Sequence, residues 1–279
     1  MASLYLFRVK VQKNAQGSLF GQDIEPRKII TKAISSKPSA ELRKGYIWHI
    51  GNVAFIDSEG LSFAAGRTTK KSKELYDDNE KNFLEVEDKE SPFTYVYYDM
   101  KYGFFAIEPK SKLSPTVKGI ANNIEKLLNR QDVVIDSGYR IEISEIWDPE
   151  GFLNDIHQAY AVVGFTVHFG KPNPFDVEAD FHRPLERFLD ETGGERGKAT
   201  VQGQDLDRDR IEEVTRSVAS TGNDASARIR MNEGQRPVTR HLKGDPVSIP
   251  IEDEERADRR TLLDKLRNAY IRVRRHPDE

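Results

Sequence analysis

FTYVYYDMKYGFFAIEPKSKLSPTVKGIANNIEKLL (Phe93–Leu128) is the stretch that decides the fold class, because the sequence pattern changes within it. Its first half is rich in aromatic and β-branched residues, which predicts two strands that pair across Met100 and Lys101. Ser114 and Pro115 then favour the start of a helix. The apolar residues that follow recur at helical spacing, as Val117, Ile120, Ile124, Leu127 and Leu128.

The residues before this stretch indicate strands. Leu4–Val11 alternates between apolar and polar side chains, and three short apolar segments within residues 46–67 are separated by turn residues, as in a β-meander. Residues 70–91 are mostly charged, which predicts an exposed excursion that is partly helical.

After Leu128, strand patterns and helical patterns alternate, and an amphipathic helix over Glu254–Arg274 closes the chain. The low apolar share favours two lobes over a single sphere. We therefore expect an α+β protein with three parts. These are a β-rich N-terminal lobe (1–112), a lobe of alternating strands and helices (113–250), and a C-terminal helix that packs on either lobe (251–279).

The composition excludes several classes of protein. The chain has 279 residues, of which 37% are hydrophobic and 32% are charged, and this balance favours a shape with much surface. The absence of cysteine excludes disulfide bonds, thiolate nucleophiles and Cys-ligated zinc. No run of about 18 apolar residues occurs, and MASLYLFRVK is too short and too charged for a signal peptide. The sequence therefore predicts a cytoplasmic protein.

Charge is distributed unevenly along the chain, whose net charge is -3. Residues 1–50 carry 9 Lys and Arg against 3 Asp and Glu, residues 51–222 carry 21 against 32, and residues 223–279 carry 13 against 11. A polyanion responds to the local charge within a Debye length of roughly 8 Å, so a basic surface is compatible with an acidic chain. Two stretches near the C-terminus are locally basic: Arg267–Arg275, and residues 228–243, which contain Arg228, Arg230, Arg236, Arg240 and Lys243.

Arg228 and Arg230 are the strongest candidates for contacting a ligand. They stand two positions apart in a predicted strand over residues 225–231, so they project from the same face. Two like charges about 7 Å apart are unfavourable unless an anion lies opposite, and phosphate oxygens match the geometry of arginine. The sequence therefore predicts a DNA-binding site at this pair, with Arg236, Arg240 and Lys243 as flanking residues. A solvated face paired with acids of a neighbouring strand is the alternative.

One arrangement of residues suggests catalysis. Asp99 ends the first strand of the predicted hairpin, and Glu108 and Lys110 follow the second, as in nucleases that hold Mg²⁺ with two carboxylates beside a lysine. In a tight hairpin, however, Asp99 lies near the turn and Glu108 at the far end. Phosphate-binding loops, HExxH zinc motifs and GxSxG elbows are absent from the sequence. We therefore expect neither enzymatic activity nor a cofactor or metal site.

From Tyr46 onward, the order of segments resembles the RexA-like phage-exclusion proteins. The resemblance rests on YIWHIGNVAFID, on the strand–strand–helix order of residues 93–128, and on GYRIEISEIWDPEGFLNDIHQAYAVVGFTVHF as strand, helix and strand. In the C-terminal part, ATVQGQDLDRDRIEEVTRSVAS precedes SARIRMNEGQ and a final amphipathic helix. The KwaB component of Kiwa defence systems is similar in its arrangement.

This resemblance implies a cytoplasmic sensor of a phage-exclusion, or abortive-infection, system that binds double-stranded DNA with little sequence preference as a homodimer. It also implies a small multi-spanning membrane protein as a further partner, and it assigns the basic pair of the DNA-binding strand to Arg228 and Arg230. The acidic segment of residues 51–222 departs from the family. Two alternatives remain. One is a protein-interaction module or inhibitor whose basic face binds an acidic partner, and the other is a Mg-dependent nuclease that uses Asp99, Glu108 and Lys110.

Overall fold

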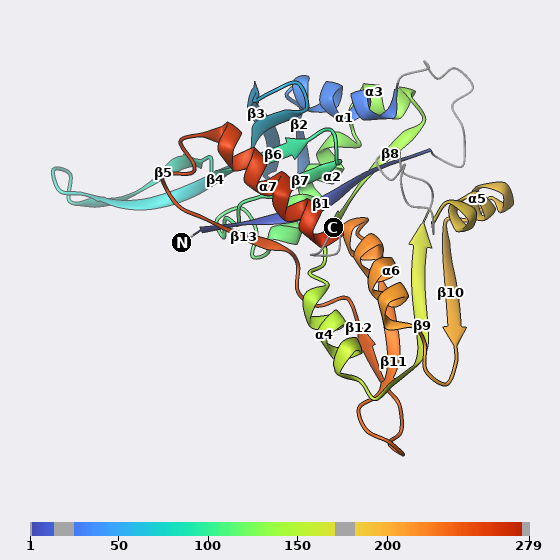
Figure 1. The fold of residues 1–279 in the computed structure, drawn as a ribbon. Helices are drawn as coiled ribbons and strands as arrows, with labels where there is room; N and C mark the ends of the chain where they lie inside the picture. Colours follow the sequence, from blue (N-terminus) through green and yellow to red (C-terminus); the bar gives the residue numbers. More distant parts are fainter. Residues whose placement is uncertain (1, 14–24, 171–181, 275–279) are drawn as a thin grey trace.

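The computed structural model describes residues 2–13, 25–170 and 182–274, and these form a mixed α+β fold built on two antiparallel sheets (Figure 1). This confirms the predicted fold class. The nine strands of the large sheet are β1 (Ala2–Lys13), β2 (Ser39–Arg43), β3 (Tyr46–Phe55), β4 (Gly60–Asp77), β5 (Asn82–Glu90), β6 (Phe93–Asp99), β7 (Phe104–Ile107), β8 (Tyr139–Glu145) and β13 (Ser248–Ile251). The four strands of the small sheet are β9 (Ala161–Gly170), β10 (Arg196–Gln202), β11 (Ala225–Arg230) and β12 (Val238–His241). The helices are α1 (Pro26–Ser35), α2 (Val117–Leu128), α3 (Asp132–Asp136), α4 (Glu150–Gln158), α5 (His182–Thr192), α6 (Arg208–Ser220) and α7 (Arg259–Arg274).

Strand β1 holds the large sheet together, because it pairs with β7, β8 and β13. Its side chains alternate between two cores. Leu4 and Leu6 belong to the core that α6 and α7 cover, whereas Phe7 and Val9 belong to the core beneath α1 and α2. The sheet is therefore buried on both faces at its centre, which explains why the aromatic stretch around residues 93–107 is apolar on both sides. The predicted hairpin of β6 and β7 is confirmed.

Helix α2 carries the predicted apolar stripe, with Ile120, Ile124 and Leu127 fully buried. It begins two residues later than Ser114 and Pro115 suggest. The Thr116 hydroxyl accepts a hydrogen bond from the Gly119 N–H at 3.1 Å, so Thr116 is the N-cap.

The two sheets do not divide at the predicted boundary between residues 112 and 113. Strands β8 and β13 both follow that boundary in the chain, yet each pairs with β1 in the large sheet. The change of period at residue 114 marks a helix that covers the large sheet. Strand partners far apart in the sequence leave no local signal, so the periodicity could not show this pairing.

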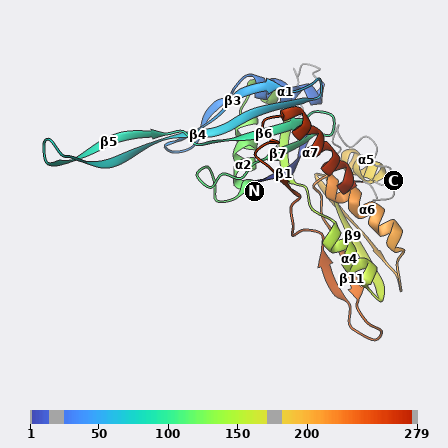
Figure 2. The ribbon, with the colours of Figure 1, turned by 60° about the vertical axis from the view of Figure 1, so that its left-hand side comes forward.

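Residues 74–76 and 78–85 are exposed as expected for this segment, but the predicted partial helicity of residues 70–91 is wrong. They form a long two-stranded ribbon of β4 and β5, which projects from the large sheet (Figures 1 and 2). The register pairs Leu75 with Leu84 and Tyr76 with Phe83, and such cross-strand apolar pairs stabilise a ladder. The charges between them made the strand pattern hard to recognise.

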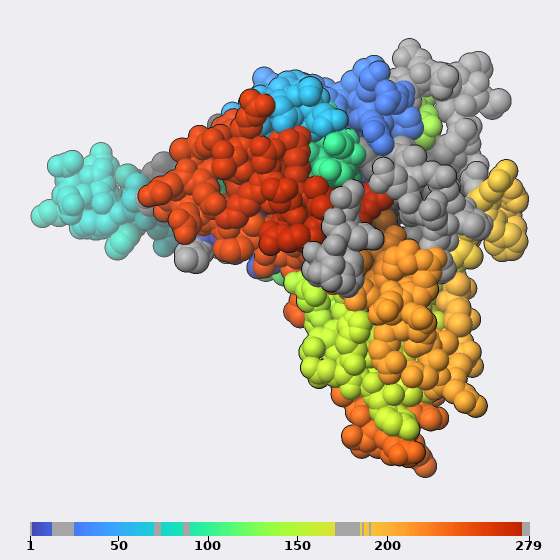
Figure 3. Space-filling model, viewed as in Figure 1, coloured from blue at the N-terminus to red at the C-terminus, as the bar shows by residue number. Residues whose placement is uncertain are grey.

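The predicted C-terminal helix is present, although it begins at Arg259 rather than at Glu254. It lies across one face of the large sheet and contacts β6 and α6 (Figure 3). Arg267 fixes its position, because the guanidinium donates to Asp99 at 2.6 Å and to Asp57 at 2.8 Å. None of the helices in the described residues is long and apolar enough to cross a membrane.

Candidate nucleic-acid interface

The small sheet has one buried face and one open face. On β11, Ala225, Ala227 and Ile229 are buried in the core. Helices α4 and α6 lie over this inner face (Figure 1). Because side chains alternate along a strand, Arg228 and Arg230 project from the opposite, open face. Arg228 is exposed and Arg230 is half-buried.

Arg228 lies over a strand that leaves room for it. Its neighbour across the ladder is Gly164 of β9, and a Cβ at that glycine would lie 3.6 Å from the Arg228 Cβ and 3.7 Å from its Cδ. The aliphatic stem therefore rests on the β9 backbone while the guanidinium extends into solvent. Within the described residues, neither Arg228 nor Arg230 forms an ion pair with a carboxylate. The Nε of Arg230 is buried without a hydrogen-bond partner.

Strand register brings further cations onto the same face. The β9 residue His168 is paired with Lys198 of β10, and Thr166 is paired with both Thr200 and Ser226. Lys198 therefore lies on the Arg228 face, two strands away, or about 10 Å across the sheet. Arg196, two residues before Lys198, has the same orientation by alternation. The sequence analysis did not identify Arg196 or Lys198 as candidates. Strand β10 lies about thirty residues before β11 in the chain, and the two strands share a face only because both pair with β9 in the sheet.

The four strands of the small sheet contain no acidic residue. Their sequences are AVVGFTVHFG, RGKATVQ, ASARIR and VTRH, in a chain that has 46 Asp and Glu among 279 residues. These strands therefore contribute no carboxylate to the open face, on which Gln202 accompanies the Arg, Lys, His, Ser and Thr side chains. This face, comprising Arg196, Lys198, His168, Arg228 and Arg230, is called the basic sheet face below.

The three flanking candidates lie in different places. Arg236 is exposed in the loop between β11 and β12, at the end of the small sheet. Arg240 is paired with Ala227, so it projects from the inner face, where its Nε contacts Asp155 of α4 at 2.8 Å. Lys243 lies beyond β12 with its Nζ 6.0 Å from the centre of the Trp147 ring. The structure thus brings Arg228 and Arg230 together and separates Arg240 and Lys243 from them.

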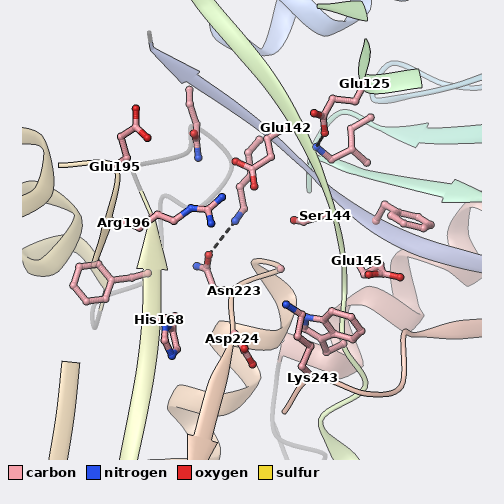
Figure 4. A pocket seen from close by; sticks show the side chains of 18 of the residues that line it. Glu125, Glu142, Ser144, Glu145, His168, Glu195, Arg196, Asn223, Asp224 and Lys243 are labelled. Carbon is pink, nitrogen blue, oxygen red and sulfur yellow. Dashed lines mark hydrogen bonds between the residues drawn. The ribbon is translucent and has the colours of Figure 1, made fainter. Parts of the chain in front are cut away.

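A cleft of about 630 Å³ lies where the basic sheet face meets β1 and β8 of the large sheet (Figure 4). Its walls carry both signs of charge, including Arg196, Glu142 and Glu195. The Lys10 ammonium, which is almost fully buried, donates to the Asn223 side chain at 3.0 Å. The carboxylates of this cleft form the acidic border of the basic sheet face.

The turn from α6 into β11 forms one wall of the cleft. Gly222 there has a φ of +66°, and a Cβ at this position would lie 2.4 Å from the Ser144 Oγ of β8. Only glycine fits, both because of the left-handed backbone and because the turn lies so close to β8.

The residues of the proposed nuclease do not converge. Asp99 is fully buried beside the hairpin turn, where it accepts hydrogen bonds from the Tyr102 N–H and from Arg267, both at 2.6 Å. Glu108 follows the far end of β7 and contacts Arg256 at 2.7 Å. With a rise of about 3.4 Å per residue, the hairpin separates the two carboxylates by roughly 13 Å. Within residues 2–13, 25–170 and 182–274, no group of three or more His, Asp or Glu side chains is arranged to hold a metal ion.

Burial raises the pKa of Asp99, against the opposing effects of the Tyr102 N–H and Arg267. The hydrogen bond from Arg267 lowers the pKa of Asp57. Asp99 and Asp57 therefore both bind the Arg267 guanidinium of α7.

No protein-family model matches the chain, and no curated protein matches it.

Proposed function

We propose that this protein binds double-stranded DNA without sequence preference through the basic sheet face. The observation that carries the proposal is the absence of any acid from the four strands of the small sheet, together with an exposed Arg228 that no carboxylate of the described residues neutralises. Arginine and lysine contacts to phosphate oxygens set affinity and orientation but do not distinguish bases. The face presents no helix or narrow ribbon to a groove, which supports contact with the backbone alone.

For the biological role, the proposal rests on the resemblance in segment order described above. We propose a cytoplasmic sensor of a phage-exclusion system that acts as a homodimer and signals to a small multi-spanning membrane protein. The proposal assigns no catalysis and no cofactor to the protein. Dimerisation would place two basic sheet faces on one duplex, so that an acidic protomer still offers an extended basic surface.

The salt dependence of binding tests the proposal. Each phosphate contact contributes about -0.9 to the slope of the logarithm of the binding constant against the logarithm of salt concentration. Five contacts, from Arg196, Lys198, Arg228, Arg230 and Arg236, give a slope of about -4.5 per protomer. Replacing Arg228 and Arg230 by Ala should flatten it by about 1.8 and weaken binding to all duplexes equally.

Arg240→Ala is the matched control, because it removes the same charge from the neighbouring strand but from the inner face. Fluorescence anisotropy with two random duplexes of unrelated sequence, in Mg²⁺ and in EDTA, provides the measurement. A slope that is unchanged in the Arg228→Ala, Arg230→Ala variant would refute the site. Binding of an acidic polypeptide that duplex DNA fails to compete away would favour the protein-interaction alternative, and Mg²⁺-dependent cleavage would favour the nuclease.

A further inference from the structure

The ribbon of β4 and β5 ends in an apolar tip that the protomer does not cover. Tyr76 and Phe83 face each other across the two strands, with ring centres 5.0 Å apart, and Leu75 and Leu84 form the next pair. All four side chains are exposed, and Phe83 is 82% exposed. Successive pairs project from opposite faces, so both sides of the tip are apolar. Figures 2 and 3 show the ribbon extending well away from the rest of the molecule.

The same tip is acidic. Residues 74–85 contain Glu74, Asp77, Asp78, Glu80 and Glu85, against Lys81 as the one base. Glu74 is paired directly with Glu85 in the ladder, and like charges in this position are destabilising unless a cation lies nearby. An exposed apolar patch surrounded by negative charge is complementary to a protein surface that has an apolar centre and basic surroundings. A nucleic acid or an anionic membrane would repel it.

A surface with these properties lies at the root of the ribbon. Directly after β5, a groove of about 450 Å³ is lined by Phe93, Tyr95, Lys110, Lys112 and Arg256, among others. Phe93 is 46% exposed, and its ring meets the edge of the Tyr95 ring at 5.6 Å. Lys110 and Lys112 are exposed. Glu90 and Glu108 also line the groove, and Arg256 is paired with Glu108 at 2.7 Å. The three bases of the lining still outnumber its two acids, so the exposed Lys110 and Lys112 give the groove a small excess of positive charge around an aromatic floor.

We infer that two copies of this chain associate through their ribbons, which lie antiparallel, with the acidic apolar tip of each copy in the basic groove at the root of the other. A two-fold axis between the ribbons requires this reciprocity, because a tip that reaches the partner's root places the partner's tip at its own root. The contact covers Tyr76 and Phe83 with Phe93, and it places the Glu74–Glu85 pair near Lys110 and Lys112. This inference supplies a surface for the homodimer of the proposed function and rests on that part of it alone.

The oligomeric state and its dependence on the tip provide the first test. Wild type should sediment as a dimer, and Tyr76→Ser with Phe83→Ser should raise the dimer dissociation constant roughly tenfold or more, as expected for removal of buried interface aromatics. Phe55→Ser and Phe188→Ser are matched controls, because both residues are 63% exposed and lie outside the ribbon. They should leave the dissociation constant unchanged. A monomeric wild type, or a dimer that the tip substitutions do not weaken, overturns the inference.

An exchange of charge provides the second test. Variant one carries Lys110→Glu and Lys112→Glu, and variant two carries Asp78→Lys, Glu80→Lys and Glu85→Lys. Each variant alone opposes like charges at both contacts and should be monomeric. An equimolar mixture should dimerise, because the acidic root of variant one meets the basic tip of variant two while the other contact keeps its native charges.

Failure of the mixture to dimerise, when each variant is folded by circular dichroism, overturns the antiparallel arrangement. Duplex binding is measured on the same proteins. A dimer that depends on the ribbon but does not bind DNA would reject the proposed function and support this inference. A protein that binds DNA but whose dimerisation does not depend on the ribbon would support the proposed function and reject this inference.

Discussion

Removing the positive charge of Arg267 should destabilise the protein strongly, because this side chain of α7 neutralises the buried Asp99 carboxylate of the large sheet. Arg267→Met keeps much of the aliphatic stem and removes the guanidinium. That group donates to Asp99, Asp57 and Asp264 at 2.6, 2.8 and 3.1 Å. The Asp99 side chain is fully buried, whereas Asp57 and Asp264 reach solvent. After the substitution, the Tyr102 N–H is the one hydrogen-bond donor to the Asp99 carboxylate that remains among the described residues.

The expected loss of folding free energy follows from leaving the buried Asp99 charge without Arg267. Leaving a buried charge without its partner costs about 3–5 kcal/mol, and the partly solvated pairs with Asp57 and Asp264 add about 1 kcal/mol at most. We expect a loss of about 4 kcal/mol and, at roughly 2–4 °C per kcal/mol for a chain of this size, a fall in Tm of about 10 °C. Arg272→Met is the matched control, because Arg272 is exposed on the same helix and should change Tm by about 1 °C at most.

The loss should also depend on pH. Burial already raises the pKa of Asp99, and removal of Arg267 removes one of the groups that oppose this rise. When the pKa of Asp99 is higher in the folded state than in the unfolded state, the folded state binds more protons than the unfolded state. The free-energy cost of burying the Asp99 carboxylate without Arg267 is therefore full above the folded-state pKa and shrinks as the pH falls below it.

Thermal unfolding at about pH 8 and about pH 5, followed by circular dichroism, measures both effects. The Tm deficit of Arg267→Met relative to wild type should be smaller at the lower pH. A deficit that is equal at both values, or a fall in Tm no greater than that of Arg272→Met, would refute the reasoning.

Three further predictions concern the small sheet and its junction with the large one. Arg196→Ala with Lys198→Ala should flatten the salt dependence of duplex binding by about 1.8, as for the pair on β11, in the same anisotropy assay. Arg240→Ala should leave that slope unchanged and lower the free energy of unfolding by about 0.5 kcal/mol, measured in urea, because its pair with Asp155 is solvated. Gly222→Ala should lower the free energy of unfolding by about 2 kcal/mol or more, since the added Cβ meets the Ser144 Oγ in a strained backbone; a neutral effect would show that the turn can move.

The sequence by itself determined the fold class and the orientation of the two central arginines. The period of 3.6 in residues 117–128 and the aromatic pattern of residues 93–107 are local properties, and both elements are present where they were expected. The alternation of buried and exposed positions in ASARIR is equally local, so the outward orientation of Arg228 follows from the pleat of any strand.

Only the tertiary structure decided which distant strands are neighbours. The pairing of β8 and β13 with β1, and of β10 with β9, depends on contacts between residues that are far apart in the chain, and no periodicity encodes a partner. The same long-range register adds Lys198 to the Arg228 face and turns Arg240 toward Asp155, although their charges and spacings looked alike in the sequence. In the charged segment of residues 70–91 the pairing is local, yet only the structure shows that it forms a ribbon, in which Leu75 lies opposite Leu84 and Tyr76 opposite Phe83.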